Sequence, residues 1–406
     1  MNVSSRYQDL LAFLKSHNIP CSDCDPCDCG CQCSGSLTQL NGDASFRRYY
    51  RLKLNNDEFT KLCETTKVKP RVAYVGSIII MDAPPETQKN QEFVALNRVL
   101  DHANVLVPAI FISDLEHGFM VLEDMGDFVY INSIPEGKEP AYYFKTIREL
   151  TKIGAMPLNQ EQALRLEEYR TKALNDPNIE SHVLPKYKLD EVDYQTLAAL
   201  PNFDDDFIKM ELNICTEWLF EKTLKLNLTQ DDKAMLDKAY NFISQSLQSQ
   251  PQVAMHRDYH SRNIMVTPAG NEISILSRFA ILDYQDMVKG PIAYDLASIG
   301  YDCYVDMEDD FAQRICSFAY EVYSACGIFD SKVISREQFK SMILICAIER
   351  HIKVLGLFNR LNLRDGKSGY LQYLPRVLNY VLKNCDSFAE LKDFKAFLEQ
   401  HVQGKI

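Results

Sequence analysis

The sequence predicts an α+β protein of two lobes, in which a small β-rich N-terminal lobe precedes a larger α-rich C-terminal lobe. Strand-like segments cluster before residue 122, whereas the pattern is helical almost throughout from Tyr142 onward. A chain of 406 residues with 46% hydrophobic content is long enough to fill two cores. We therefore predict an N-terminal segment over residues 1–35, an N-lobe over 36–122 and a C-lobe over 123–406. Residues 122–127 are the expected hinge.

Five segments of the N-terminal part have the pattern of a helix or a strand. Helical spacing of the apolar residues predicts an amphipathic helix over residues 5–17. Aromatic, basic and β-branched residues predict strands over 45–54 and 73–81, and a further strand is expected over 117–122. Residues 91–100 show helical periodicity. In the C-terminal part, the longest expected helix runs from about Arg336 to Arg360.

A cysteine-rich segment follows the first predicted helix. Six of the 13 cysteines lie between residues 20 and 36, separated by Gly, Ser, Pro and Asp; they are Cys21, Cys24, Cys27, Cys29, Cys31 and Cys33. This composition predicts a loop or an insertion, because it cannot build a packed element. Closely spaced thiolates also suit zinc or copper(I), so metal binding stays an alternative. The remaining cysteines are scattered, which indicates a reducing compartment.

Composition excludes several classes of function. The formal charge of −12 argues against nucleic-acid binding, which requires a basic face, although it is compatible with a magnesium-bound nucleotide. No apolar run approaches the roughly 18–20 residues that span a bilayer. The N-terminus lacks the basic-then-apolar order of a signal peptide. We therefore expect a cytoplasmic protein without a membrane partner, and the sequence leaves its oligomeric state open.

The strongest chemical signal lies in a polar loop between two apolar strand patterns, at residues 253–266. Asp258 precedes Asn263 by five residues, the offset between the catalytic carboxylate and the metal-binding amide of a kinase catalytic loop. Asp283 follows another apolar strand pattern, where a second metal ligand would be delivered. Phosphoryl transfer requires a carboxylate that accepts the proton of the attacking hydroxyl, and oxygen ligands for magnesium. We therefore predict Asp258 as the catalytic base and Asn263 and Asp283 as ligands of Mg²⁺.

Neighbouring residues of this loop have less specific interpretations. His256 and His260 are expected to be buried, hydrogen-bonding residues that hold the loop together rather than reacting groups, and Arg257 to help hold it. A single Asp or Asn in a loop is more often a turn or cap residue. The complete ordered set of His, Asp, His and Asn, followed by a strand that ends in Asp, favours function.

This two-histidine loop resembles that of the aminoglycoside phosphotransferase and choline kinase superfamily, and the resemblance runs from about residue 36 to 385. Further stretches resemble the bacterial kinases that phosphorylate the anomeric hydroxyl of N-acetylmuramate and N-acetylglucosamine. These stretches are GDASFRRY (42–49), MDAPPE (81–86), LEDMGD (122–127), LDYQD (282–286), GPIAYDL (290–296) and ERHIKVLG (349–356). The resemblance implies a two-lobed protein-kinase-like fold, ATP as phosphoryl donor and an amino sugar acceptor used in peptidoglycan recycling.

The nucleotide side departs from the usual kinase pattern. No G-x-G-x-x-G loop is present, and the third-strand lysine is replaced by Met81-Asp82. Among the nearby cations we expect Arg48 to contact the phosphates, because strand alternation directs Arg47 and Arg51 to the other face. Glu123 and Met125 lie in the expected hinge, where backbone groups would bind adenine.

The acceptor side is less specific. Asp204, Asp205 and Asp206 are expected to cap a helix. Glu211 and Glu217 on that helix are candidate acceptor-binding residues, with a role at the helix N-terminus as the alternative. Arg350 on the long helix is a further candidate, which could instead face solvent. Acidic residues would also suit a cationic aminoglycoside. A kinase for an aminoglycoside, choline or another alcohol therefore stays an alternative, and so does a scaffold without activity.

Overall fold

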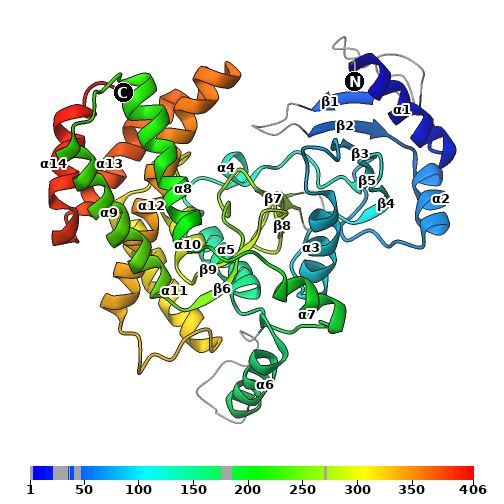
Figure 1. The fold of residues 1–406 in the computed structure, drawn as a ribbon. Helices are drawn as coiled ribbons and strands as arrows, with labels where there is room; N and C mark the ends of the chain where they lie inside the picture. Colours follow the sequence, from blue (N-terminus) through cyan, green and yellow to red (C-terminus); the bar gives the residue numbers. More distant parts are fainter. Residues whose placement is uncertain (1–2, 22–34, 36, 41–46, 175–184, 269–271) are drawn as a thin grey trace. The chain divides into compact units, whose positions relative to one another are not determined.

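The computed structural model describes residues 3–21, 35, 37–40, 47–174, 185–268 and 272–406. Residues 22–34 of the predicted cysteine-rich segment lie outside the described residues. The chain divides into two compact units, which are drawn in Figure 1. Unit 1 comprises residues 1–101, 105–129 and 264–286, and unit 2 comprises residues 102–104, 130–263 and 287–406. The predicted boundaries at residues 35 and 122 stay predictions.

Unit 1 contains a five-stranded antiparallel sheet. Its strand order is β1-β2-β3-β5-β4. The strands are β1 (Leu37–Leu40), β2 (Arg48–Lys53), β3 (Ser77–Asp82), β4 (Ile110–Asp114) and β5 (Phe119–Glu123). The helices of the unit are α1 (Val3–Ser16), α2 (Asn56–Thr66) and α3 (Asn90–His102). The predicted β-rich character of this part of the chain is confirmed.

One hydrophobic core joins the first helix to the sheet. The apolar stripe of α1 packs against sheet residues such as Tyr50, Ile80 and Val121, and Phe59 of α2 belongs to the same cluster. Cys21 packs against this cluster from the end of the α1 segment. Because α1 has buried residues at helical spacing, the amphipathic pattern in the sequence is enough to explain its position.

A second antiparallel pair completes unit 1. Strands β7 (Ile264–Thr267) and β8 (Arg278–Ile281) pair with each other, so that Ile264 lies opposite Ile281. Single bridges connect Ala280 to Leu106 and Met265 to Val129. These residues form a small apolar cluster of Leu106, Met125, Met265 and Ala280, against which Val72, Val129 and Leu282 pack.

Unit 2 is mainly helical, as the sequence predicts. Its helices are α4 (Tyr130–Ser133), α5 (Glu139–Gly154), α6 (Gln160–Leu174), α7 (Glu191–Ala198), α8 (Asp205–Cys215), α9 (Gln230–Gln248), α10 (Tyr294–Gly300), α11 (Asp309–Ala325), α12 (Arg336–Asp365), α13 (Leu374–Cys385) and α14 (Lys392–His401). A π-helical turn, η2 (Thr216–Thr223), continues α8, and short 3-10 turns lie at η3 (Ser368–Tyr373) and η4 (Ala389–Leu391). Strands β6 (Gln252–Met255) and β9 (Val288–Pro291) form an antiparallel pair, of which the sequence predicts β6 as the strand before the catalytic loop but does not predict β9.

Helix α12 lies at the centre of unit 2. Figure 1 shows it grouped with α8, α9 and α13, and every residue from Ile343 to Gly356 is buried. A capping box at Ser335 begins the helix, and Gly366, with φ of 68°, ends it. At Gly356 the helix passes so close to α8 that a Cβ atom would lie 2.4 Å from the backbone of Ile214 and Cys215. Glycine at this position therefore sets how closely the two helices approach.

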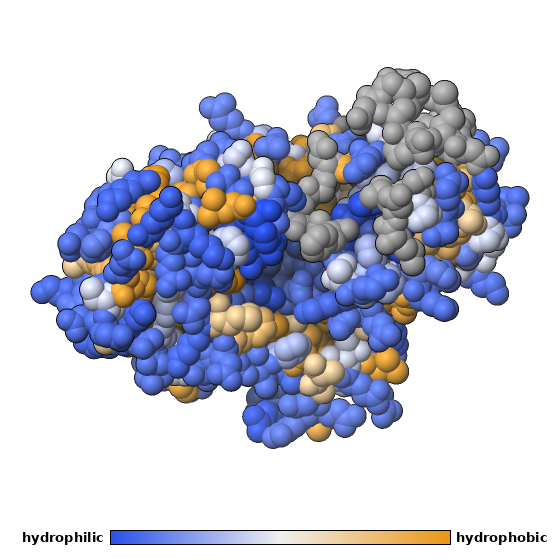
Figure 2. All heavy atoms as spheres, turned by 45° about the horizontal axis from the view of Figure 1, so that its top comes forward, coloured by the Kyte–Doolittle hydropathy of each residue, from blue (hydrophilic) through white to orange (hydrophobic). Residues whose placement is uncertain are grey.

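The surface is largely polar. Hydrophilic side chains cover most of the face shown in Figure 2, with hydrophobic ones in scattered positions. None of the described helices combines the length and the apolar composition that a membrane span requires.

Candidate active site

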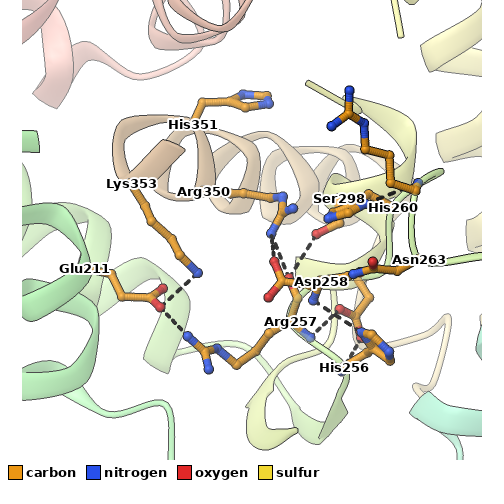
Figure 3. A network of polar contacts seen from close by, with 12 residues as sticks. Glu211, His256, Arg257, Asp258, His260, Asn263, Ser298, Arg350, His351 and Lys353 are labelled. Carbon is orange, nitrogen blue, oxygen red and sulfur yellow. Dashed lines mark hydrogen bonds and ion pairs between the residues drawn. The ribbon is translucent and has the colours of Figure 1, made fainter. Parts of the chain in front are cut away.

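The predicted catalytic loop follows β6 in unit 2 and contains a sharp turn. Arg257 adopts a φ of 75°, in the left-handed region that non-glycine residues seldom occupy. The Asp295 carboxylate, at the start of α10, accepts the backbone N–H of His256 at 2.7 Å and that of Arg257 at 2.9 Å. These bonds hold the turn in its unusual conformation, as at many functional sites. The turn directs Asp258 into a network of charged side chains (Figure 3).

Arg350 of α12 is the direct partner of the Asp258 carboxylate. Its Nη1 lies 3.1 Å from Asp258 Oδ1 and also donates to the carbonyl oxygen of Arg257 at 2.7 Å. The Arg350 side chain is 4% exposed, whereas the Asp258 side chain remains 33% exposed. The buried Arg350 thus holds the Asp258 carboxylate in place, while part of the Asp258 side chain stays accessible to a ligand.

Glu211 of α8 joins two further cations to this network. Its Oε1 accepts from Arg257 Nη2 at 2.5 Å and from Lys353 Nζ at 2.9 Å. Lys353 lies one helical turn after Arg350 on α12, so both side chains lie on the same side of that helix. Glu211 and Lys353 are buried, and Figure 3 shows the chain of contacts from Glu211 through Arg257 to the loop that carries Asp258.

The electrostatic effect of these groups on Asp258 is large. Burial by itself would raise the pKa of the Asp258 carboxyl, but the positive charges of Lys353, Arg350 and Arg257 outweigh burial and hold that pKa well below its usual range. Asp258 therefore stays ionised throughout the neutral range. An ionised, partly exposed and firmly oriented carboxylate is suited to accept a hydrogen bond, and then a proton, from a hydroxyl group.

The two histidines of the loop have structural surroundings. His256 is fully buried, and its Nδ1 faces the backbone N–H of Asp258 at 3.3 Å. His260 is also buried, and its Nδ1 faces the N–H of Arg262 at 3.3 Å. Burial, followed by the charge of Arg350, lowers the pKa of His260. Both rings support the loop backbone, in agreement with the interpretation from the sequence.

Asn263 ends the loop immediately before β7. Its side-chain N–H donates to the carbonyl oxygen of Asp258 at 3.0 Å. This bond fixes the amide so that its oxygen, rather than its nitrogen, is the atom turned away from the loop. Asn263 and Asp258 therefore lie together in unit 2, as the five-residue spacing predicts.

Asp283 lies in unit 1, two residues after β8. It has a φ of 63°, and its carboxylate accepts from Gln285 at 2.7 Å and lies 3.9 Å from Nη1 of Arg47. The Asp283 side chain is 47% exposed. The next residue, Tyr284, accepts a hydrogen bond from the Asn97 side chain at 2.6 Å, and this bond anchors the end of the strand. Arg47, and not Arg48, is thus the arginine that faces Asp283.

Arg48 faces a different acid. It lies opposite Asp82 in the pairing of β2 with β3, and its Nη1 is 4.0 Å from the Asp82 carboxylate. Asp82 is buried and also binds Arg6 of α1 at 2.6 Å. Asp82, with two arginine partners, therefore lies close to the position at which a typical kinase has its third-strand lysine.

The two hinge candidates have different environments. Glu123 is buried, and its carboxylate accepts backbone N–H groups of Arg71, Val72 and Ala109 at 2.7, 2.8 and 3.0 Å. Burial raises its pKa, and the three N–H groups oppose that shift. The Glu123 side chain thus organises the surrounding loops. Met125 is buried in the small apolar cluster of unit 1.

The structure therefore brings four predicted residues into one network: Asp258, Asn263, Glu211 and Arg350. Glu217 is not part of it, because its side chain is 52% exposed and pairs with Lys222. Asp204 caps α8 through the N–H of Phe207, as expected. Sequence reasoning missed Lys353 and Asp295. The spacing of Lys353 from Arg350 on a long helix was the available signal for the first, whereas Asp295 carries no local signal.

Comparisons with known proteins identify similar chains. A profile described as "Phosphotransferase enzyme family" matches residues 36–325. Three proteins named N-acetylmuramate/N-acetylglucosamine kinase match over about nine-tenths of both chains. Those of Pseudomonas putida and Neisseria meningitidis are 28% identical over 90% of this chain and cover 89% and 90% of their own lengths. The Pseudomonas aeruginosa protein is 26% identical over 91% of this chain and 90% of its own.

Solved structures show the same fold. An ethanolamine kinase of Plasmodium vivax superposes with a TM-score of 0.52 and 13% identity over 86% of this chain and 82% of its own. An aminoglycoside 2'-phosphotransferase solved with GDP has a TM-score of 0.52 and 11% identity over 95% of this chain and 99% of its own. The protein-kinase-like α+β fold expected from the sequence is confirmed.

Proposed function

Because the chain belongs to the phosphotransferase enzyme family, we propose that it transfers the γ-phosphoryl group of ATP to the anomeric hydroxyl of N-acetylmuramate or N-acetylglucosamine. The observation that carries the kinase assignment is the Asp258 carboxylate, which is partly exposed yet kept ionised and oriented by Arg350. The choice of acceptor is supported by the names of the relatives, which match most of the chain.

Asp258 is the residue that would orient the acceptor. In this role its carboxylate accepts a hydrogen bond from the anomeric hydroxyl and takes the proton as the new O–P bond forms. The bond between the γ-phosphorus and the bridging oxygen breaks at the same time, so that ADP leaves and the sugar becomes a 1-phosphate. An anomeric hydroxyl is more acidic than an ordinary alcohol. A carboxylate with a low pKa can therefore suffice as base, because the proton needs to move only late in the reaction.

Magnesium fits the residues proposed to hold it. The amide oxygen of Asn263 and the carboxylate of Asp283 are hard oxygen donors, which Mg²⁺ prefers. The amide of Asn263 is already oriented by its bond to Asp258, and Asp283 is 47% exposed. When bound, the ion would neutralise charge on the β- and γ-phosphates.

The apolar cluster of unit 1 supports the nucleotide side of the proposal. Met125, Leu106 and Met265 gather there with Val72 and Leu282 around them. Such side chains provide flat, adaptable apolar contacts of the kind that hold a purine ring. We propose that adenine packs against this cluster, with Arg47 rather than Arg48 as the nearest arginine to the metal ligand Asp283.

The proposal is tested by incubating the protein with γ-labelled ATP, magnesium and a panel of acceptors. We expect label on N-acetylmuramate or N-acetylglucosamine, in a product that hydrolyses in mild acid because the phosphate sits on an acetal carbon. The free sugar should lose its reducing end as it is consumed. Label in an acid-stable product that keeps its reducing end would overturn the anomeric assignment, and label only on an aminoglycoside or choline would overturn the amino sugar assignment.

A further inference from the structure

The network beneath Asp258 contains one acidic residue that the proposed reaction does not use. Glu349 of α12 is fully buried, and neither oxygen of its carboxyl has a hydrogen-bond partner among the described residues. Burying an ionised carboxylate without a donor is among the most costly arrangements in a protein. The surroundings of Glu349 must therefore either supply a donor or disfavour its ionised form.

The groups that interact with Glu349 come from three helices. They are Glu211 of α8, Tyr294 of α10, and Cys346, Arg350 and Lys353 of α12. Asp295 of α10 acts on Cys346, and Arg257 of the catalytic loop acts on Tyr294. The cations of the network are engaged elsewhere: Lys353 and Arg257 bind Glu211, and Arg350 binds Asp258. The Tyr294 hydroxyl is near enough to Glu349 to act as a donor that lowers its pKa, but burial has the larger effect and raises that pKa.

The second acid of this group shows the same shortage of donors. Glu211 receives both of its cations on Oε1, and its buried Oε2 has no hydrogen-bond partner within the described part of the chain. Three buried carboxyl oxygens, two of Glu349 and one of Glu211, thus lack a hydrogen-bond donor among the described residues. A single proton held by one of the two carboxyls removes one negative charge and creates one donor. This is the usual solution where two carboxyls share an environment.

We propose that Glu349 is a positioning residue that keeps its proton in the folded protein and donates it in a hydrogen bond to the Glu211 carboxylate. Glu211 is the ionised partner because it alone has cations on its oxygen. The bond fixes Glu211, which in turn fixes Arg257 and Lys353, two of the cations that keep Asp258 ionised. Loss of the proton would add one negative charge beside Glu211 and draw Lys353 and Arg257 away from their present positions. The effect on catalysis rests on the proposed function, whereas the protonation itself does not.

The first test measures thermal stability against pH for the wild type and Glu349→Gln. Burial, followed by the charge of Glu211, raises the pKa of Glu349 from 4.5 to about 8. Below pH 4.5 the residue carries its proton in both the folded and the unfolded chain. Between these pH values the unfolded chain releases a proton that the folded chain keeps, so wild-type stability falls as pH rises. The Tm of Glu349→Gln relative to wild type should therefore increase between about pH 4.5 and 8 and then stay constant. A Tm difference that does not change with pH would overturn the proposal.

The second test measures kcat against pH with saturating acceptor. Wild-type kcat should fall by up to about tenfold per pH unit above the pKa of Glu349, and Glu349→Gln should lack this alkaline limb because an amide does not titrate. Glu161→Gln is the matched control, since Glu161 is exposed on α6 and pairs only with Arg165; it should show the wild-type profile. An alkaline limb in Glu349→Gln identical to that of the wild type would contradict the positioning role.

One further measurement keeps the proposal testable. If Glu349→Gln does not fold, infrared spectroscopy of the wild type should detect a protonated carboxyl at about pH 7 that is lost above about pH 9, and its absence would overturn the proposal. The Tm and infrared measurements need no substrate. Failure of the amino sugar assignment would therefore leave them unchanged, and the two failures can be told apart.

Discussion

Asp258 is held by side chains from three separate parts of unit 2, which restrict the orientation of its carboxylate. Asp295 fixes the backbone just before it, Arg350 binds its oxygen, and Glu211 holds the neighbouring Arg257. Buried groups with defined partners are restricted to one conformation, so the carboxylate is oriented before a ligand arrives. Single substitutions in this network therefore test the proposed catalytic role of Asp258 most directly.

Asp258→Asn should lower kcat by about 10²–10⁴-fold, because an amide cannot accept the proton of the acceptor hydroxyl. The affinity for MgATP should stay close to the wild-type value, since the carboxylate acts on the acceptor. Asp283→Asn should instead weaken magnesium-dependent nucleotide binding, which titration of each variant with MgATP would measure. If Asp258→Asn kept more than about a tenth of the wild-type kcat, its assignment as base would be wrong.

Arg350→Gln should reduce kcat by on the order of 10²-fold, because the carboxylate and the Arg257 carbonyl lose the donor that orients them both. It should also move the acidic limb of the kcat profile to higher pH, since one of the charges that lower the pKa of Asp258 is removed. Arg350→Lys keeps the charge but not the planar fork, so we expect its acidic limb to stay in place while kcat still falls. Equal acidic limbs in Arg350→Gln and the wild type would show that Arg350 does not tune Asp258.

At the scale of elements, the approach of α12 to α8 positions the network. The contact at Gly356 brings the two helix axes close, one turn away from the place where Lys353 reaches Glu211 at 2.9 Å. The π-helical turn η2 begins at the same point, immediately after Cys215. π-helical insertions of this kind often lie at functional sites, because they shift the side chains that follow by part of a turn.

Gly356→Ala should therefore destabilise the protein by about 1–3 kcal/mol, because the new Cβ would meet backbone atoms that cannot rotate away. It should also lower kcat by separating Glu211 from Lys353. Gly154→Ala is the matched control: its Cβ would meet Tyr323 at 3.6 Å, an ordinary contact, so its Tm and kcat should match the wild type. Chemical denaturation and kcat of both variants test this. Equal stabilities of Gly356→Ala and Gly154→Ala would show that the helices can separate freely.

Elements with a strong period were predictable from the sequence, and those defined by partners were not. The helix expected over 336–360 is α12, which runs from Arg336 to Asp365, and the helix expected over 5–17 is α1. The strand expected over 73–81 is shorter, the strand expected before the catalytic loop is β6, and β9 has too few residues for a visible period. In the network, Asp258 and Asn263 follow from their spacing. Lys353, Asp295 and Glu349 do not, because their roles depend on contacts between segments distant in the sequence.

At the scale of the whole molecule, the chain has the fold of a known kinase family, and we propose that the catalytic network does not require the cysteine-rich segment. The described residues of that network lie between Glu211 and Lys353, far along the chain from residues 22–34. Cys21 packs against the core shared by α1 and the sheet. We therefore expect that residues 22–34 can be removed without loss of the fold, whereas removal of Cys21 destabilises it.

Replacing residues 22–34 by a short Gly-Ser linker should leave kcat within about threefold of the wild type and Tm nearly unchanged, since loop insertions are usually tolerated. Extending the deletion to Cys21 should lower Tm, because a side chain that packs on the core is lost. Comparison of the two deletions by thermal unfolding and turnover isolates the contribution of that contact. Zinc content measured before and after the shorter deletion would test the alternative that the segment binds metal. Loss of activity in the shorter deletion would show that the segment takes part in folding or catalysis.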